Sequence, residues 1–207
     1  TDLASENARK NRLDKRFATF MQQEDLNVSL VGVCDLFDFR SDLGVQASKN
    51  EVKPGGKPKE TATAYQHYTD LLSNDDIDAV IVATPDHWHS RITIDAAKAG
   101  KHVYCEKGLT RTFDEAIDVY DTVKRTGITF QLGHQNRQVE ANYKAKRIID
   151  QGLLGPINMV ELTTNRNSPW GAWIWGIHPD GNERTIDWKT FQEPVPIKNR
   201  IPFGEEA

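Results

Sequence analysis

The amino-acid sequence predicts an α/β fold built on a parallel β-sheet. Short apolar segments alternate with longer segments of helical character, which is the pattern of β-α-β units. The apolar segments are hydrophobic throughout rather than at alternate positions, as strands are when helices cover both faces of their sheet. With 207 residues, of which 27% are charged, the chain is long enough for one large domain and part of another.

The first part of the chain supplies a helix, a strand and a polar excursion. A helix is predicted over residues 2–23, because apolar residues in its second half recur at spacings of three and four. Residues 28–34 are short, apolar and β-branched, and they predict a buried strand that ends at Asp35. Residues 41–63 are polar and rich in glycine and lysine, and we interpret them as a short helix followed by a surface excursion.

The elements that follow alternate regularly. Helices are predicted over 68–72, 89–99, 112–125 and 139–150, and strands over 78–83, 102–105, 128–132 and 157–164. Gly100 and Gly127 stand where helices end, and Thr112 with Glu115 has the spacing of a capping box.

The predicted strand at 157–164 alternates in polarity and is expected to begin a new sheet. We therefore divide the chain into a nucleotide-binding domain, residues 1–135, and the start of a second, open-sheet α/β domain, residues 136–207. The second part contains an aromatic loop with Trp170, Trp173 and Trp175, and it is too short to close a core alone.

Composition excludes several classes of protein. The net charge of −4 and the pI of about 5.9 do not indicate the excess of positive charge that is typical of nucleic-acid-binding proteins. No apolar run approaches the roughly 18 residues of a membrane span. The two cysteines, Cys34 and Cys105, end apolar runs and are expected to be free thiols.

In a parallel sheet of this kind, ligands bind beyond the carboxyl ends of the strands. Four turns in the sequence occupy that position, and they hold the candidate functional residues: Asp35, 84–89, 106–107 and 133–137. Asp35 is placed to accept hydrogen bonds from the ribose hydroxyls of an adenosine, or else to act as an ordinary turn former.

The turn at 84–89 contains His87 and His89, which suggests a metal site, a ligand contact or a helix cap. The spacing fixes no third metal ligand, so no metal site is predicted. Glu106 and Lys107 form either a proton-transfer pair or an exposed ion pair of little energy. Gly108 is interpreted as a turn position that a side chain would block.

The succession of these motifs resembles the Gfo/Idh/MocA family, which includes glucose–fructose oxidoreductase and inositol dehydrogenase. The resemblance covers residues 28–165 and is strongest over 76–110, which read DIDAVIVATPDHWHSRITIDAAKAGKHVYCEKGLT. It implies a Rossmann domain followed by an open-sheet α/β domain, and an enzyme that uses NAD or NADP to oxidise a sugar, cyclitol or related polyol.

The resemblance also assigns roles residue by residue. Lys107 contacts the substrate and assists proton transfer, and Asp35 favours NAD over NADP. The cofactor-binding residues that it implies are Asp35, Thr84, Pro85, His89, Glu106, Lys107 and Gln135. The substrate-facing residues are Lys107, Asn136 and Arg137, and we add Trp173 from the aromatic loop.

Three departures from the family pattern affect these assignments. Gly108 replaces the proline of the Glu-Lys-Pro signature, which leaves the pose of Lys107 open. The glycine-rich phosphate-binding turn is absent from the 207 residues, and we expect it, with the first strand of the sheet, to precede residue 1. The later catalytic segment is expected to follow residue 207.

Three functions stay open at this point. The first is the dehydrogenase described above, and the second is a relative that cleaves glycosides by transient oxidation at carbon 3 followed by elimination. The third is a non-catalytic NAD-binding protein. A homodimer or homotetramer is expected for the full protein, without membrane or nucleic-acid partners. The compartment is left open between the cytoplasm and, given a twin-arginine signal, the periplasm.

Overall fold

A computed structural model describes residues 28–49, 61–135, 137, 139–162 and 176–203. The described chain falls into two compact units. One unit contains the described residues up to Ile77 together with Arg184–Phe191, and the other contains Asp78–Glu183 with the residues from Gln192 onward. All described strand pairs are parallel, which confirms the predicted fold class.

The first unit is built on two short parallel strands, β1 (Gly32–Cys34) and β2 (Thr63–Tyr65). The helices α2 (Asp38–Ser48) and α3 (Tyr68–Leu72) pack against them. Strand β2 was not predicted, because three residues after a long polar stretch show no periodicity. Helix α7 (Trp188–Phe191) also belongs to this unit.

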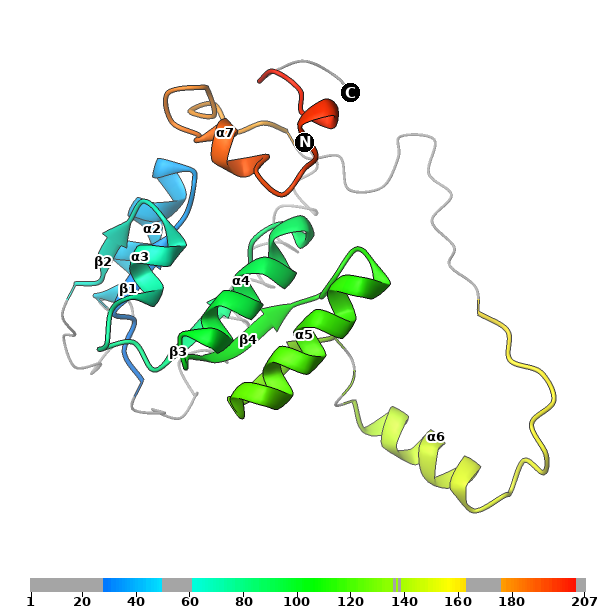
Figure 1. Ribbon diagram of the computed structural model, residues 1–207. Coiled ribbons are helices and arrows are strands. Elements are labelled where there is room, and N and C mark those ends of the chain that lie inside the picture. The colour runs from blue at the N-terminus through cyan, green and yellow to red at the C-terminus, as the bar shows by residue number, and fades with distance from the viewer. Residues whose placement is uncertain (1–27, 50–60, 136, 138, 163–175, 204–207) are drawn as a thin grey trace, which may run out of the picture. The chain divides into compact units, whose positions relative to one another are not determined.

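The second unit is built on a three-stranded parallel sheet. Its strands β3 (Ala79–Val82), β4 (His102–Glu106) and β5 (Phe130–Gly133) lie in the order β3-β4-β5. Helices α4 (Asp86–Lys98) and α5 (Phe113–Thr126) pack on each other, and α4 also packs on β3 and β4 (Figure 1). A further helix, α6 (Glu140–Asp150), and a 3₁₀ turn at Ile197–Asn199 complete the described elements.

The core of this unit lies between the sheet and helices α4 and α5. Val82, Val103 and Cys105 point to this side and are almost completely buried. Ile81 points to the opposite side and is 76% exposed, so the described residues cover only one face of the sheet. Burying this apolar layer provides the main stabilisation of the unit.

The start of α5 and the ends of α4 and α5 have the capping residues that the sequence predicted. Thr112 Oγ1 accepts the Glu115 amide at 3.2 Å while the Glu115 carboxylate accepts the Thr112 amide at 3.2 Å, so the capping box is confirmed. Gly127 ends α5 with a left-handed φ of 70°, a conformation that favours glycine. Gly100 likewise follows α4, with a φ of 75°.

Two predicted boundaries are wrong. Helix α4 begins at Asp86 rather than at residue 89, because Pro85 at the N-cap fixes φ at −59° and leads directly into the helix. No strand forms over the described residues 157–162, where Met159 and Leu162 are 78% and 92% exposed. A strand needs a neighbour for its hydrogen bonds, and the described chain offers none there.

Candidate functional site

The register of the β3-β4-β5 sheet brings three of the four predicted turns to one edge. Val82 pairs with Cys105, and Cys105 pairs with Leu132, so the three strands end at the same level. The turns that begin at Thr84, Lys107 and His134 therefore leave the sheet side by side. Asp35, in the fourth turn, lies in the other unit.

The turn after β3 offers an unsatisfied hydroxyl. Thr84 Oγ1 is buried and has no hydrogen-bond partner in the described part of the chain. A buried hydroxyl without a partner costs stability, so such an atom is a natural contact for a bound ligand. Pro85 follows at the N-cap of α4 and has no amide hydrogen to donate.

In the turn after β4, the carboxylate of Glu106 binds the backbone rather than the lysine side chain. Its Oε2 accepts the amide of Lys107 at 3.2 Å, and its Oε1 accepts the hydroxyl of Tyr104 at 3.4 Å. Desolvation and the neighbouring Glu106 carboxylate raise the pKa of Tyr104 above its ordinary value.

The side chain of Lys107 is directed to solvent. The residue is exposed, and its ammonium makes no ion pair with any residue that the structure describes. The alternative of an exposed Glu106–Lys107 ion pair is therefore wrong, and the amine is available to a ligand.

Gly108 does not have the role that the sequence suggested. An added Cβ would meet no atom within 4 Å, and the backbone φ is not in the left-handed region. The space beside Gly108 is open, so the interpretation that a side chain would block the turn is wrong. The Lys107–Gly108 peptide bond is cis.

His89 is the most deeply buried of the candidate residues, with 1% of its surface exposed. Its Nδ1 lies 2.7 Å from the carbonyl oxygen of Gly108, and its Nε2 lies 2.7 Å from the carbonyl oxygen of Thr84. Because α4 begins at Asp86, His89 is inside the helix and not at its cap. Its predicted place among the cofactor-binding residues stays a prediction.

The turn after β5 holds the last of the candidate residues. Gln135 and Arg137 are exposed, while Asn136 lies outside the described residues, as does Trp173. The His134 amide donates to the Leu132 carbonyl at 2.9 Å and closes a tight turn. The predicted contacts of Gln135 and Arg137 with cofactor and substrate stay predictions.

Gly133 and Tyr104 form a feature that sequence reasoning missed. A Cβ at Gly133 would lie 2.5 Å from the hydroxyl and 2.8 Å from Cζ of Tyr104. The tyrosine ring thus lies across the glycine, and its hydroxyl reaches Glu106 beside Lys107. Gly133 directly follows the predicted strand 128–132 and is the last residue of β5, and a glycine at that place is the signal that could have indicated such a close approach.

Asp35 directly follows β1, as predicted. Its Oδ1 accepts the amide of Phe37 at 2.9 Å, which closes a local turn. Although the residue is exposed, desolvation raises the pKa of its carboxyl, while the Phe37 amide and Arg40 act in the opposite direction. The carboxylate can therefore both form the turn and accept a hydrogen bond from a ligand.

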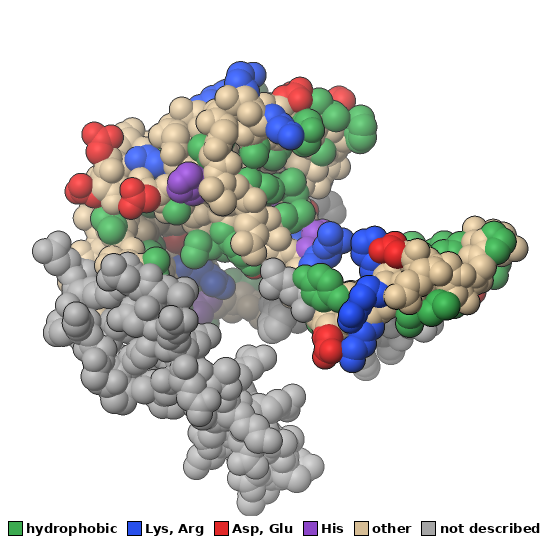
Figure 2. Space-filling model, turned by 90° about the horizontal axis from the view of Figure 1, so that it is seen from below, with side chains coloured by type: hydrophobic (Ala, Val, Ile, Leu, Met, Phe, Trp, Pro, Cys, Tyr) green, Lys and Arg blue, Asp and Glu red, His purple; other side chains and the backbone are tan. Residues whose placement is uncertain are grey.

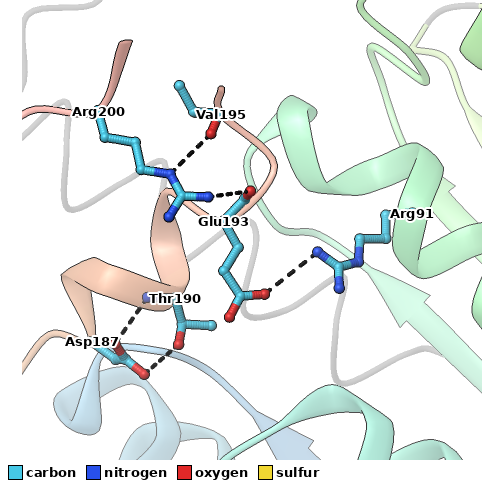
Figure 3. Close-up of polar contacts among 6 residues, drawn as sticks. All are labelled: Arg91, Asp187, Thr190, Glu193, Val195 and Arg200. Carbon is cyan, nitrogen blue, oxygen red and sulfur yellow. Dashed lines mark hydrogen bonds and ion pairs between the residues drawn. The ribbon is translucent and has the colours of Figure 1, made fainter. Parts of the chain in front are cut away.

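A distant segment borders the Asp35 turn. Phe37 forms an antiparallel bridge with Ile186, and the amide of Asp187 donates to the Leu36 carbonyl at 2.9 Å. Asp187 also accepts hydrogen bonds from Thr190, chiefly from its hydroxyl at 2.6 Å, and these lower the pKa of the Asp187 carboxyl (Figure 3). The sequence placed residues 184–191 in the second domain and gave no signal for this pairing, and the predicted domain boundary stays a prediction.

Another distant segment, residues 192–201, attaches to α4 (Figure 3). Arg91 lies over the ring of Trp88 at 5.3 Å and forms an ion pair with Glu193 at 3.4 Å. Arg200 donates to the carbonyl oxygens of Glu193 and Val195, which holds the segment in a compact loop. Both partners of the ion pair are partly exposed, so we expect its energy to be below about 1 kcal/mol.

The described part of α6 and the residues after it expose apolar side chains (Figure 2). Val139 at the N-cap and Tyr143 and Ile149 on the helix are 45–55% exposed, and Leu153 is 69% exposed.

The two cysteines, Cys34 and Cys105, are free thiols, as predicted. Desolvation, with a smaller contribution from the Asp35 carboxylate, raises the pKa of Cys34 to about 11. Among the described residues, no helix is suited to cross a membrane, and no cluster of side chains is suited to hold a metal.

Comparison with known proteins identifies the family. The model of an oxidoreductase family with an NAD-binding Rossmann fold matches residues 14–134, more than half of the chain. The chain belongs to the Gfo/Idh/MocA oxidoreductase family. This confirms the resemblance and the Rossmann fold that the sequence predicted.

Three relatives show the range of activities nearby. Levoglucosan dehydrogenase of Pseudarthrobacter phenanthrenivorans is 41% identical over 87 residues, which are 42% of this chain and 22% of the relative. Alpha-N-acetylgalactosaminidase of Shewanella oneidensis is 27% identical over 164 residues, 79% of this chain and 34% of the relative. The crystal structure of myo-inositol 2-dehydrogenase from Lactobacillus plantarum is 31% identical, with a TM-score of 0.51 over 70% of this chain and 40% of that chain. The chain spans about a third or less of the length of these curated relatives.

Proposed function

We propose that the protein is an NAD-dependent oxidoreductase that acts on a hydroxyl group of a sugar, cyclitol or related polyol. The observation that carries this proposal is the exposed amine of Lys107, which has no described partner and stands at the edge of the sheet beside the turn of Thr84. Two of the relatives, the levoglucosan and myo-inositol dehydrogenases, bear names that fit this substrate class.

We propose that two groups, one in each unit, contact a nicotinamide cofactor. Thr84 Oγ1 is a buried hydroxyl in need of a partner, and Asp35 keeps a carboxylate oxygen for a ribose hydroxyl. A carboxylate in this position repels a 2′-phosphate, which favours NAD over NADP. Bound NAD would supply the hydride acceptor for oxidation of the alcohol carbon.

The chain's own part in the reaction centres on Lys107. In its neutral form, the Nζ amine accepts the proton of the substrate hydroxyl while the carbon that carries this hydroxyl loses its hydride. In the reverse reaction, the resulting ammonium returns the proton to the oxygen. Glu106 contributes by holding the Lys107 amide rather than its ammonium, so the amine keeps its freedom to meet the substrate. Gln135 and Arg137 of the next turn are proposed to border the cofactor and substrate, respectively.

A second candidate is a glycoside-cleaving enzyme that oxidises its substrate transiently and regenerates NAD in every cycle. It is favoured by the similarity to alpha-N-acetylgalactosaminidase, which extends over 79% of the chain. The oxidation step would use the same Lys107 amine, so the described site does not separate the two reactions.

Two assays of the purified protein distinguish these functions. Incubation with NAD and a panel of cyclitols and sugars should give net NADH, measured by its absorbance. Release of nitrophenol from p-nitrophenyl N-acetyl-α-galactosaminide without net NADH would identify the glycoside-cleaving reaction instead. Binding of NAD without either product would indicate a non-catalytic protein and overturn both proposals.

A further inference from the structure

The environment of His89 requires an unusual number of hydrogen-bond donors. Both of its ring nitrogens lie 2.7 Å from backbone carbonyl oxygens, which can only accept hydrogen bonds. A neutral imidazole carries one N–H group, so one of the two contacts would place a nitrogen lone pair against an oxygen lone pair. Both contacts are favourable only when both nitrogens carry protons.

The two carbonyl groups belong to two different turns of the site. The Thr84 carbonyl precedes the N-cap of α4, where the first helical hydrogen bond runs from the Trp88 amide to the Pro85 carbonyl at 3.0 Å. The Gly108 carbonyl immediately follows Lys107. His89 therefore connects the turn after β3 to the turn after β4 through a side chain that is 1% exposed.

This connection fixes the backbone on both sides of Lys107. Glu106 Oε2 accepts the Lys107 amide at 3.2 Å, and His89 Nδ1 binds the carbonyl oxygen of the next residue, Gly108. The lysine side chain itself has no described partner. The backbone that carries the amine is thus held by one local and one tertiary contact, while the amine is left to the ligand, as preorganised sites require.

We propose that His89 is a positioning residue, a doubly protonated imidazole that ties the Thr84 turn to the Lys107–Gly108 turn and so sets the place of the lysine. Because both ring nitrogens are engaged with the backbone, His89 acts through these two turns rather than by touching the cofactor. The effect on Lys107 chemistry rests on the proposed function, whereas the doubly protonated ring and the tie between the turns do not.

The state of the ring is tested in the unaltered protein. In the full protein labelled with ¹⁵N-histidine, long-range ¹H–¹⁵N correlation spectra separate doubly protonated rings from neutral ones, and the signal of His89 is assigned by its loss in His89→Gln. The spectra are recorded at about pH 8, where an unperturbed imidazole is neutral. We expect His89 to show protons on both nitrogens. A neutral, single-tautomer pattern would overturn the proposal.

Hydrogen exchange tests the tie itself. Glutamine presents both of its N–H groups on one nitrogen, so His89→Gln cannot bind two carbonyls that lie on opposite sides of a ring. We expect exchange to rise about tenfold or more in two segments at once, 84–88 and 106–110. The matched control is Ile92→Ala, which shortens a buried side chain three residues further along α4.

The two variants separate positioning from general destabilisation. If His89 only stabilises the unit, Ile92→Ala and His89→Gln should raise exchange in the same pattern, and the proposal fails. If exchange in 106–110 rises only in His89→Gln, the tie is established even when the protein shows no dehydrogenase activity. Should His89→Gln not fold, the spectra of the unaltered protein still decide the question, with His89 assigned by backbone-directed experiments.

Discussion

The turn after β1 and the turn after β4 carry the two charged side chains on which the proposed function depends, but they are held in different ways. Asp35 closes its own turn through the Phe37 amide, two residues away. The side chain of Lys107 takes no part in holding its turn, which is fixed by Glu106 and by His89, a residue 19 positions before Gly108. The Asp35 carboxylate holds its own turn and has only its remaining hydrogen-bonding capacity for a ligand. The Lys107 amine holds no part of its turn and is wholly available to a ligand.

The largest expected effect comes from Lys107→Met, which keeps the length of the side chain and removes the amine. Because general acid–base assistance contributes roughly 10²–10⁴-fold, we expect kcat to fall by that factor, with the dissociation constant for NAD nearly unchanged. Steady-state kinetics and NAD titration measure the two quantities. Lys98→Met, an exposed lysine in the last turn of α4, serves as the control. Unchanged turnover in Lys107→Met would remove the lysine from the mechanism.

The complementary change is Asp35→Asn. An asparagine oxygen can still accept the Phe37 amide, so the turn should persist while the charge is lost. Loss of a hydrogen bond to a charged group costs about 1.5–3 kcal/mol, so we expect NAD affinity to fall roughly 10–100-fold with little change in kcat at saturating NAD. The difference in affinity between NAD and NADP should become smaller at the same time.

The raised pKa of Asp35 adds a dependence on pH. On acidification its carboxylate is lost at a higher pH than that of an ordinary aspartate, and NAD affinity should decrease there in the unaltered protein but not in Asp35→Asn. Equal NAD affinities of the two proteins at neutral pH would contradict the assignment of Asp35 to the ribose.

The smallest effects distinguish two glycines beside the Lys107 turn. In Gly133→Ala, the new methyl group meets the Tyr104 ring, which must move away from Glu106, so we expect a loss of about 1–3 kcal/mol in the free energy of unfolding. In Gly108→Ala, the methyl group enters open space, and the free energy of unfolding should rise by roughly 0.4–1 kcal/mol. Denaturant unfolding measures both, and the reverse order would show that the packing around the turn is wrongly described.

The sequence predicted what depends on neighbours along the chain. The parallel strands, the capping box at Thr112 and the left-handed Gly127 all follow from local patterns. The four turns were selected by the rule that ligands bind beyond the carboxyl ends of parallel strands, and three of them share one sheet edge. The resemblance to the family supplied the candidate residues within those turns.

What the sequence missed depends on contacts between distant residues. Nothing in the local pattern indicates that His89 reaches the carbonyl of Gly108, that Tyr104 lies over Gly133, or that Ile186 pairs beside the Asp35 turn. The interpretation of Gly108 from local sequence was also wrong. A glycine in a turn is usually required because a side chain would clash or because the backbone is left-handed, and neither condition holds at Gly108.

The most direct test of the account is a double-mutant cycle between His89 and Lys107, measured as kcat. If His89 acts through the lysine, His89→Gln should lower kcat about tenfold or more in the unaltered protein but less than about threefold in the Lys107→Met background, because the group that it positions is already gone. An equal reduction in both backgrounds would show that His89 affects turnover independently of Lys107 and would contradict the account.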